Sequence, residues 1–255
     1  MQVWIAPLAL LLGIGSPPVP PSPPDPETLS RNLTQIQPQW PRGGFPVPPP
    51  ARKTDCARLR CVALTFDDGP GEHTASLLDA LAEHRARATF FVVGQVVDGG
   101  DGRDLRRMVA EGHELGNHSW SHSDLAGLPE GGIEQELRRT QEVVRRITGV
   151  RMTLMRPPYG ATDDRVAEMS RRAGLAQILW SLDTLDWLER DGAALLRRAG
   201  TAEPGSIVLM HDIHRETVEA VPRLLEDLTA RGYTFVTLSE LYGHALTPGQ
   251  AYLER

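Results

Sequence analysis

The sequence predicts an α/β fold in which about seven parallel strands close, or partly close, into a (β/α) barrel. From residue 61 onward, short β-rich runs alternate with amphipathic helical stretches. This alternation predicts parallel strands joined by crossover helices. Each cluster of chemically suggestive side chains also directly follows a predicted strand, and in such barrels the carboxyl ends of the strands carry the active site. An open, doubly wound sheet is the alternative, but the clusters favour the barrel.

The chain is long enough for one domain with a sizeable core, because it has 255 residues and barrels of this length commonly form a single domain. Its 27 basic and 33 acidic residues give a net charge of -6. This balance argues against a nucleic-acid partner, since phosphate binding needs a basic face. We expect a monomer with a catalytic domain at 55–243 and a C-terminal tail at 244–255.

Residues 1–16 are predicted to be a signal peptide or an apolar leader. The apolar run at 3–14 is too short to cross a bilayer and has the length of a signal-peptide core, so we expect no stable membrane span. No charged residue precedes Asp25, so the usual basic n-region is missing, which a start site placed too far downstream would explain. An apolar tail on a cytosolic protein is the alternative.

Residues 17–54 are predicted to be a proline-rich, disordered spacer. The first fifty residues carry 14 of the 21 prolines, and such a composition favours an extended polyproline conformation. In a secreted protein this spacer would hold the domain away from a membrane or a wall. A spacer with no particular role fits the composition equally well.

The two cysteines, Cys56 and Cys61, lie just before the first predicted strand. A disulfide across this short loop fits an oxidising compartment and would fix how the spacer enters the domain. Two free thiols are the alternative. A zinc knuckle would need a second cysteine pair, which the chain lacks.

The predicted elements follow one another in regular order. Segments rich in β-branched, aromatic and aliphatic residues are the predicted strands: 61–66, 88–93, the residues around 115, 154–156, 177–182, 206–210 and 234–238. Apolar residues at helical spacing predict the helices: around 77–82, 105–109 and 133–147, and at 164–172, 191–198 and 217–230. Pro222 lies inside the last helix, which therefore either begins late or kinks there.

Asp67 and Asp68 end the first predicted strand, and Gly69-Pro70 then forces a turn. Two neighbouring carboxylates repel each other and lose hydration when they are partly enclosed. A fold therefore keeps both ionised only by adding a cation or strong donors. A solvated turn is the alternative for an isolated Asp-Asp-Gly, but the aliphatic strand that leads into this one favours a functional pair.

His118 and His122 are four residues apart, so on one helical turn their imidazoles would share a face and bind the same ion. Structural histidines are common at this spacing, and the pair alone does not decide between the two roles. A carboxylate would complete a set of two histidines and one aspartate that leaves positions open for water and substrate. Open positions indicate catalysis rather than a structural site.

Arg156 and Tyr159 belong to an Arg-Pro-Pro-Tyr-Gly segment at the end of a predicted strand. A rigid turn is the simplest interpretation of this segment. The functional interpretation is that Arg156 pairs with a carboxylate and that the Tyr159 N–H faces a developing oxyanion.

Two further clusters contain candidate site residues. Asp186 can orient a charged histidine or arginine, and Trp187 can supply an apolar wall, although ordinary core packing is the alternative for Trp187. His211 directly follows the predicted strand 206–210 and is a candidate general acid, because the unperturbed pKa of histidine is near neutrality and a neighbouring carboxylate raises it.

Taken together and in this order, the five clusters resemble the motifs of the polysaccharide deacetylase family, the NodB-homology domain also called carbohydrate esterase family 4. The matching segments are 65–70, 118–122, 156–160, 183–187 and 209–211. The resemblance implies a distorted (β/α) barrel with the NodB-homology fold. It also implies metal-dependent removal of acetyl groups from N-acetyl sugars in a polymer.

The resemblance further implies a division of labour at the metal. Asp67 would be the general base, and Arg156 would hold it. Asp68, His118 and His122 would bind the metal, for which we expect zinc, with cobalt or manganese also compatible.

The remaining motif residues would act on the substrate. By the same resemblance, His211 would protonate the leaving amine and Asp186 would tune it. Tyr159 would donate its backbone N–H to the oxyanion, while Trp187 and Leu209 would border the acetyl pocket.

The expected substrate is a cell-wall polysaccharide, with N-acetylglucosamine of peptidoglycan favoured by the leader and the spacer. Chitin oligosaccharides, acetylated xylan and the muramic acid residues of peptidoglycan are alternatives, because specificity lies in loops outside the motifs. A non-catalytic glycan-binding module that stacks sugars on Tyr159, Trp187 and Trp120 is an alternative of another class. The intact Asp67 and His211 argue against it. We expect a secreted or cell-wall-associated enzyme.

Overall fold

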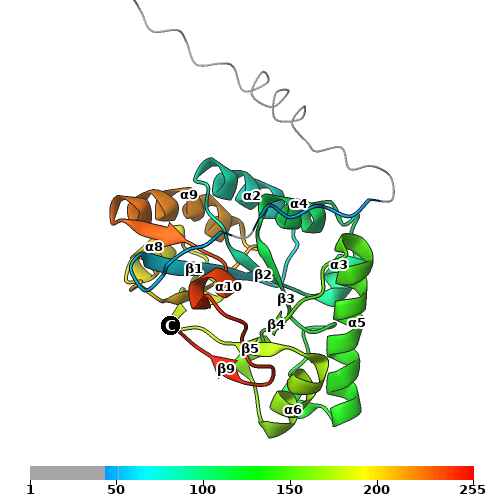
Figure 1. Ribbon diagram of the computed structural model, residues 1–255. Helices are drawn as coiled ribbons and strands as arrows, with labels where there is room; N and C mark the ends of the chain where they lie inside the picture. Colours follow the sequence, from blue (N-terminus) through cyan, green and yellow to red (C-terminus); the bar gives the residue numbers. More distant parts are fainter. Residues whose placement is uncertain (1–43, 51) are drawn as a thin grey trace, which may run out of the picture. The chain divides into compact units, whose positions relative to one another are not determined.

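The structure is a computed structural model that describes residues 44–50 and 52–255. The predicted leader and most of the predicted spacer lie outside these residues. The described chain forms a nine-stranded sheet with parallel pairing between its strands (Figure 1). Its strands are β1 (Arg60–Asp67), β2 (Thr89–Val92), β3 (Glu114–Asn117), β4 (Leu154–Met155), β5 (Ala176–Ile178), β6 (Leu182–Asp183), β7 (Ile207–His211), β8 (Tyr233–Phe235) and β9 (Ala251–Tyr252).

β1 is a central strand of the sheet, and its sequence explains why. All of its residues after Arg60 are buried and most are apolar, as expected for a parallel strand covered on both faces. It pairs with β2 and β7 along its second half and with β8 along its first. The register places Asp67, its last residue, beside Phe91 of β2 and His211 of β7.

The sheet curls so that its two ends approach each other. β5 and β6 lie near opposite ends of the strand order β6-β7-β1-β2-β3-β4-β5-β9, yet only residues 179–181 connect them. A connection of this length spans at most about 14 Å. The curled parallel sheet therefore forms a half-barrel, which confirms the predicted α/β barrel-like fold class.

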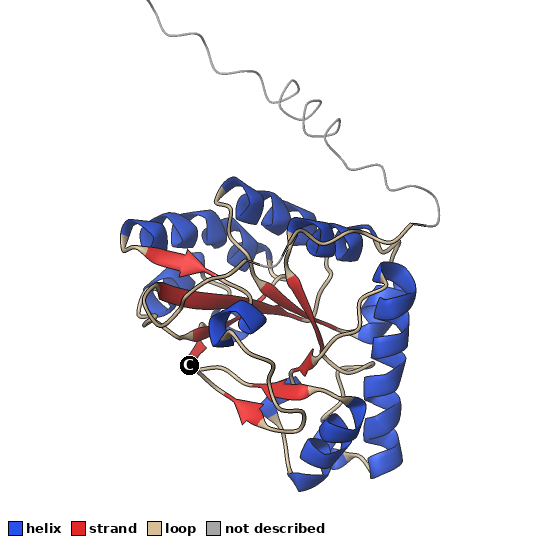
Figure 2. Ribbon diagram, in the orientation of Figure 1, coloured by secondary structure: helices blue, strands red, loops and turns tan. Residues whose placement is uncertain are grey.

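Helices cover the outside of the sheet (Figure 2). They are α2 (Thr74–Glu83), α3 (Gly94–Gly99), α4 (Arg103–Glu111), α5 (Glu130–Thr148), α6 (Asp164–Ala173), α7 (Asp186–Glu189), α8 (Gly192–Ala199), α9 (Arg215–Ala230) and α10 (Leu238–Tyr242), with 3-10 turns η1 (Leu125–Gly127) and η2 (Pro158–Gly160). At the start of several of these helices, a side chain accepts a backbone N–H group of the first turn. The Asp163 carboxylate accepts the Val166 N–H at the start of α6, and Thr237 and Glu240 form a capping box in α10.

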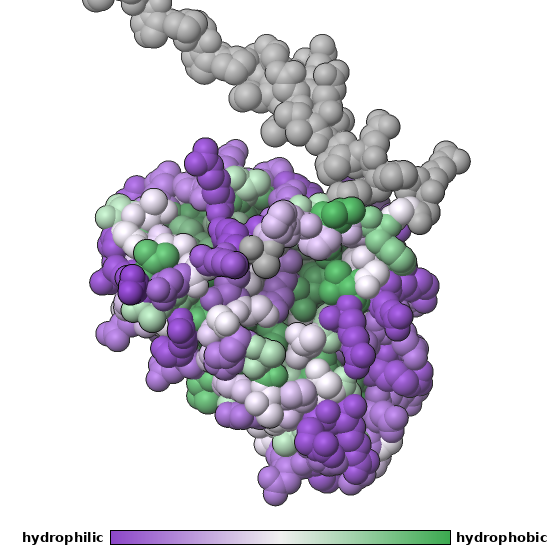
Figure 3. Space-filling view, viewed as in Figure 1, coloured by the Kyte–Doolittle hydropathy of each residue, from purple (hydrophilic) through white to green (hydrophobic). Residues whose placement is uncertain are grey.

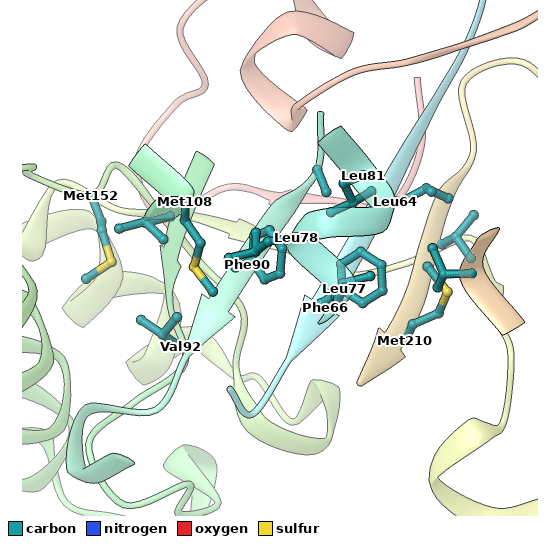
Figure 4. Packing of buried hydrophobic residues seen from close by; sticks show 14 of the residues in the cluster. Leu64, Phe66, Leu77, Leu78, Leu81, Phe90, Val92, Met108, Met152 and Met210 are labelled. Atoms are coloured by element: carbon teal, nitrogen blue, oxygen red, sulfur yellow. The ribbon is translucent and has the colours of Figure 1, made fainter. Parts of the chain in front are cut away.

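The core lies between the sheet and these helices. Figure 4 shows Phe66 of β1 and Phe90 of β2 beside the leucines of α2, and their rings stack with centroids 5.4 Å apart. Hydrophilic side chains cover the outer faces of α5 and α6 (Figure 3). The helices of the described residues are all too short or too polar to cross a membrane.

Two predicted elements differ from the structure. The single strand predicted at 177–182 is wrong, because β5 ends at Ile178 and β6 begins at Leu182. The Arg156 side chain, rather than a neighbouring strand, binds the carbonyl groups of Ile178 and Leu179, so the ladder stops there. α9 begins at Arg215 and continues through Pro222, so this helix does not begin late.

The fold also extends past both predicted ends of the catalytic domain. The segment predicted as a tail, 244–255, contains β9, which pairs with β5. At the other end, Arg52 forms an ion pair with Glu240 of α10 at 2.9 Å, so the last part of the predicted spacer contacts the domain. Cys56 forms a disulfide with Cys61, the second residue of β1.

Candidate active site

Strand pairing brings residues that are far apart in the sequence to one edge of the sheet. β1 and β7 end together, so Asp67 and His211 are register partners. β3 and β4 also end together, because Asn117 pairs with Met155. His118 and Arg156, the next residues along these two strands, therefore leave the sheet at neighbouring points.

Asp67 is held by a buried arginine. Arg156 is completely buried and Asp67 is only 2% exposed, and Nη1 of Arg156 donates to Asp67 Oδ1 at 2.8 Å. The same Nη1 donates to Thr65 Oγ1 at 2.8 Å. One oxygen of Asp67 is therefore bound to the guanidinium, while Oδ2 lies 3.7 Å from His118 Nε2, toward the neighbouring histidines.

Asp68, His118 and His122 form a compact cluster of candidate metal ligands. One ligand atom from each residue lies within 4.8 Å of the other two. Oδ1 of Asp68 is 3.4 Å from His118 Nε2 and 3.2 Å from His122 Nε2. Two imidazole nitrogens and one carboxylate oxygen are a donor set that suits zinc and related divalent ions.

The other nitrogen of each imidazole has a partner that fixes the ring. Nδ1 of His118 lies 2.8 Å from the Arg156 carbonyl oxygen, to which it can only donate. This bond leaves the lone pair on Nε2, the atom that faces Asp68. Nδ1 of His122 lies 3.2 Å from the Tyr159 hydroxyl. Both rings therefore present Nε2 to the same point.

The predicted helical turn at His118 and His122 is wrong. Both residues lie in the loop after β3. Ser119 and His122 have positive φ angles of 63° and 58°, and these left-handed residues fold the loop back on itself so that both imidazoles still meet. Asp68 also has a positive φ, of 74°, and its Oδ1 lies 3.4 Å from His118 Nε2, the same atom that Asp67 Oδ2 approaches to 3.7 Å.

The environment of Asp68 fits a cation. Its Oδ1 is buried and accepts no hydrogen bond from the described residues. Burial raises the pKa of Asp68, but the nearby imidazoles of His118 and His122 outweigh burial and lower that pKa to about 2. An ionised carboxylate with an unpartnered buried oxygen is costly on its own. A divalent ion at this point would satisfy it, so these residues fit a metal.

His211 lies on the other side of Asp67 and has its own carboxylate. Nδ1 of His211 lies 2.8 Å from Asp186 Oδ1, and Asp186 Oδ2 accepts the backbone N–H of His211 and the Thr217 hydroxyl. Burial lowers the pKa of His211, but the bond to Asp186 and its negative charge outweigh burial and raise that pKa. The same pair lowers the pKa of Asp186, against the effect of burial.

The remaining predicted site residues differ in exposure. Tyr159 is 70% exposed and Trp187 is 47% exposed, so Trp187 is not an ordinary core residue. Leu209 is buried within β7. Exposed aromatic side chains next to His122 and Asp186 offer surfaces on which a sugar ring can stack.

Two contact residues of the site were absent from the sequence-based set. Thr65 precedes Asp67 by two residues, so it faces the same side of β1 and accepts a hydrogen bond from Arg156. Thr217 lies in the first turn of α9 and donates to Asp186. A polar residue inside an apolar strand was a signal for Thr65, whereas nothing in the local sequence marks Thr217.

The half-barrel carries an Asp-His-His cluster consistent with a divalent metal site, beside an arginine-bound aspartate at the ends of its strands, and this arrangement is that of a hydrolase. The family model described as polysaccharide deacetylase matches residues 54–178. The chain belongs to this family, carbohydrate esterase family 4.

Two curated relatives act on peptidoglycan by name. Peptidoglycan-N-acetylglucosamine deacetylase PgdA of Listeria monocytogenes is 42% identical over 196 residues, which cover 76% of this chain and 41% of that protein. Peptidoglycan-N-acetylmuramic acid deacetylase PdaC of Bacillus subtilis is 36% identical over 214 residues, which cover 83% of this chain and 45% of that protein. The chain thus spans less than half the length of these relatives.

Two of the solved structures that match do so over nearly their whole length. A structure described as T48 deacetylase with substrate is 45% identical and has a TM-score of 0.74, covering 78% of this chain and 99% of that one. A family 4 acetyl xylan esterase from Clostridium thermocellum in complex with a cobalt ion is 34% identical with a TM-score of 0.71, covering 76% of this chain and 98% of that one.

Proposed function

We propose that this protein is a metal-dependent hydrolase that removes the acetyl group from N-acetylglucosamine residues of cell-wall peptidoglycan. The observation that carries the proposal is the different environment of two adjacent carboxylates. Asp68 faces His118 and His122, whereas Asp67 is bound to Arg156. One carboxylate is thereby available to a metal and the other to a proton.

Asp68, His118 and His122 would hold the metal, which we propose to be zinc, with cobalt or manganese as alternatives. When bound, a divalent ion lowers the pKa of a water molecule and polarises the acetamide carbonyl. Three protein ligands leave open positions, which is the arrangement of catalytic rather than structural sites.

Proton transfer would then be divided between two sides of the site. Asp67, oriented by Arg156, takes a proton from the attacking water, and the Tyr159 backbone N–H stabilises the oxyanion. His211 gives a proton to the departing amine. This step needs a protonated imidazole, and Asp186 favours the charged form of His211. An amine is a poor leaving group without that proton.

The named relatives support peptidoglycan as the polymer. PgdA is named for N-acetylglucosamine and PdaC for N-acetylmuramic acid, so the muramic acid residue is the second candidate. Trp187 would line the acetyl pocket together with Leu209, and Tyr159 would contact the sugar. A secreted or wall-associated location follows from the substrate and from the apolar leader at 1–16.

Acetate release tests the proposal directly. The full chain is incubated with purified peptidoglycan and with chitin oligomers, before and after metal removal by a chelator, and mass spectrometry of the digested wall locates the deacetylated sugar. We expect acetate from glucosamine residues of peptidoglycan only in the presence of metal. Acetate that persists after complete metal removal would contradict the metal mechanism, and no release from any glycan would favour a binding module.

A further inference from the structure

The histidine loop, residues 118–122, carries both histidines of the proposed metal site and is itself not part of a helix or strand. Two of its carbonyl groups have partners on α3: the N–H groups of Gly94 and Gln95, at the start of that helix, donate to the carbonyl oxygens of Ser119 and Trp120 at 3.0 and 2.9 Å. Such a loop needs partners for its N–H groups as well.

The N–H groups of His118 and Ser119 donate to the Val92 carbonyl and to Asn117 Oδ1. The next two N–H groups of the loop are bound by one carboxylate from α5. Oε2 of Glu136 accepts the backbone N–H of Trp120 at 2.9 Å and that of Ser121 at 2.8 Å, and Oε1 accepts the Ser121 hydroxyl at 3.0 Å. α3 and α5 pack side by side next to the ends of β2 and β3 (Figure 1). The loop therefore lies between two helices that bind opposite sets of its backbone groups.

We propose that Glu136 is a positioning residue that holds the histidine loop in the conformation in which His118 and His122 face Asp68. This inference rests on the proposed metal site. Trp120 and Ser121 lie between the two histidines in the sequence, so any movement of their backbone changes the separation of the two imidazoles.

The backbone of the loop explains why a fixed acceptor is needed at this point. Ser119 and His122 have left-handed φ angles, which residues with side chains adopt only when surrounding contacts impose them. Glu136 accepts two backbone hydrogen bonds, from Trp120 and Ser121, which lie between the two residues with left-handed φ angles. These bonds impose the loop conformation.

Side-chain packing makes the same connection. The guanidinium of Arg139, three residues after Glu136 on α5, lies 3.8 Å from the centroid of the Trp120 ring. A Cβ at Gly94 would come within 2.5 Å of that ring and of Thr140 Oγ1. Trp120 is therefore packed between α3 and α5. The Glu136 hydrogen bonds fix the position of the loop backbone relative to these two helices.

The chain offers a matched control on the same helix. Gln141 donates its Nε2–H to the Met152 carbonyl at 2.7 Å, so it also ties α5 to a connecting segment, but away from the histidines. Glu136→Ala and Gln141→Ala each remove one such tie. Glu136→Gln keeps a carbonyl oxygen that can accept both backbone N–H groups.

The decisive measurement is metal affinity, determined by competition between the full-length protein and a chromophoric zinc chelator. Removing groups that support metal ligands commonly weakens affinity by about 10-fold to 100-fold, and we expect a loss of this size for Glu136→Ala. Glu136→Gln should recover most of it, and Gln141→Ala should leave it unchanged. The visible absorption of the cobalt-loaded protein, which reports ligand geometry, should change only for Glu136→Ala.

Amide hydrogen exchange of the metal-free protein supplies a readout that does not depend on metal or turnover. The amides of Trp120 and Ser121 should exchange faster in Glu136→Ala than in Gln141→Ala. Wild-type zinc affinity and cobalt absorption in Glu136→Ala would overturn the inference, as would an equal loss of affinity in Gln141→Ala. Failure of the wild type to release acetate while it still binds zinc would contradict the proposed function and leave the role of Glu136 measurable.

Discussion

Arg156 Nη1 lies 2.8 Å from Asp67 Oδ1 inside the half-barrel, and both side chains are buried. The guanidinium also donates to Thr65 Oγ1 and to the carbonyl oxygens of Ile178 and Leu179. One arginine at the end of β4 thus connects β1 with the point where the sheet is interrupted between β5 and β6. It fixes the proposed general base and the curl of the sheet together.

Replacing this arginine should therefore weaken folding as well as turnover. Arg156→Met leaves Asp67 buried without its partner charge, and breaking a buried ion pair in this way costs about 3–5 kcal/mol of unfolding free energy. Urea denaturation of the variant measures the loss. The control is Arg138→Met, which removes an exposed ion pair with Glu142 and should change stability by less than about 1 kcal/mol. A similar small loss for both variants would contradict the structural role of Arg156.

Asp67→Asn should separate metal binding from catalysis. Asn cannot take a proton from water, and losing a general base typically lowers the rate by about 10²-fold to 10⁴-fold. The metal content should stay stoichiometric, because Asp68, His118 and His122 form the ligand cluster without Asp67. Metal analysis and acetate release on the same preparation check both statements. A variant that keeps its rate would remove Asp67 from the role of base.

His122→Ala should lower the metal content itself. The substitution removes one of the three ligand atoms that meet at Asp68, and two remaining ligands bind a divalent ion weakly. His214→Ala is the control, since His214 lies beside His211 with ring centroids 5.7 Å apart but is not in the ligand cluster. Elemental analysis after dialysis should show metal loss in the first variant only. Equal metal content in both would contradict the ligand set.

The pH dependence of turnover should report the bond between His211 and Asp186. Asp186 raises the pKa of His211 against the effect of burial, so the protonated acid persists to higher pH and the alkaline limb of kcat/KM lies above the ordinary range of histidine. Asp186→Asn removes the charge, and the alkaline limb should move to lower pH. The stabilising effect of this pair should likewise be complete below the ordinary histidine pKa and disappear as pH rises through the raised value.

Asp183→Asn provides the comparison for that profile. Asp183, the last residue of β6, accepts the Leu185 N–H on its Oδ1 at 2.8 Å, and none of the hydrogen bonds among the described residues joins it to His211. Its alkaline limb should match that of the wild type. An unchanged limb in Asp186→Asn would show that another group controls the alkaline side.

The order of strands and helices and the clusters at the strand ends were predictable from sequence because they depend on local periodicity and on the five motifs. Other features depend on tertiary contacts. The interruption at 179–181 arises because Arg156 binds the carbonyl groups of Ile178 and Leu179, and no local pattern encodes that contact. β9 is only two residues long and gains its strand pairing from β5.

In the candidate site, too, some features depend on tertiary contacts and could not be predicted from local sequence. Spacing alone suggested a helical turn for His118 and His122, whereas two left-handed residues in a loop bring the imidazoles together. Glu136 was missed because it lies on a helix with ordinary amphipathic spacing. Its function depends on which loop packs above it, and this is set by the pairing of β2 with β3.

Asp212 should make the stability of the protein fall as pH rises. It is completely buried beneath the turn after Asp68, where Thr74 donates to its Oδ2 and its Oδ1 lacks a partner among the described residues. Burial raises the pKa of Asp212 to about 7, above the unfolded value of 3.8. The folded protein therefore holds a proton that the unfolded chain has lost, and unfolding free energy declines between these two values. Asp212→Asn has no such proton, so the unfolding free energy of this variant relative to wild type should increase from about pH 4 to about pH 8.

Urea denaturation of the metal-free proteins measures this difference. The control is Asp227→Asn, on the exposed face of α9, which should show no trend with pH. A difference that stays constant with pH would mean that Asp212 is ionised in the folded protein throughout.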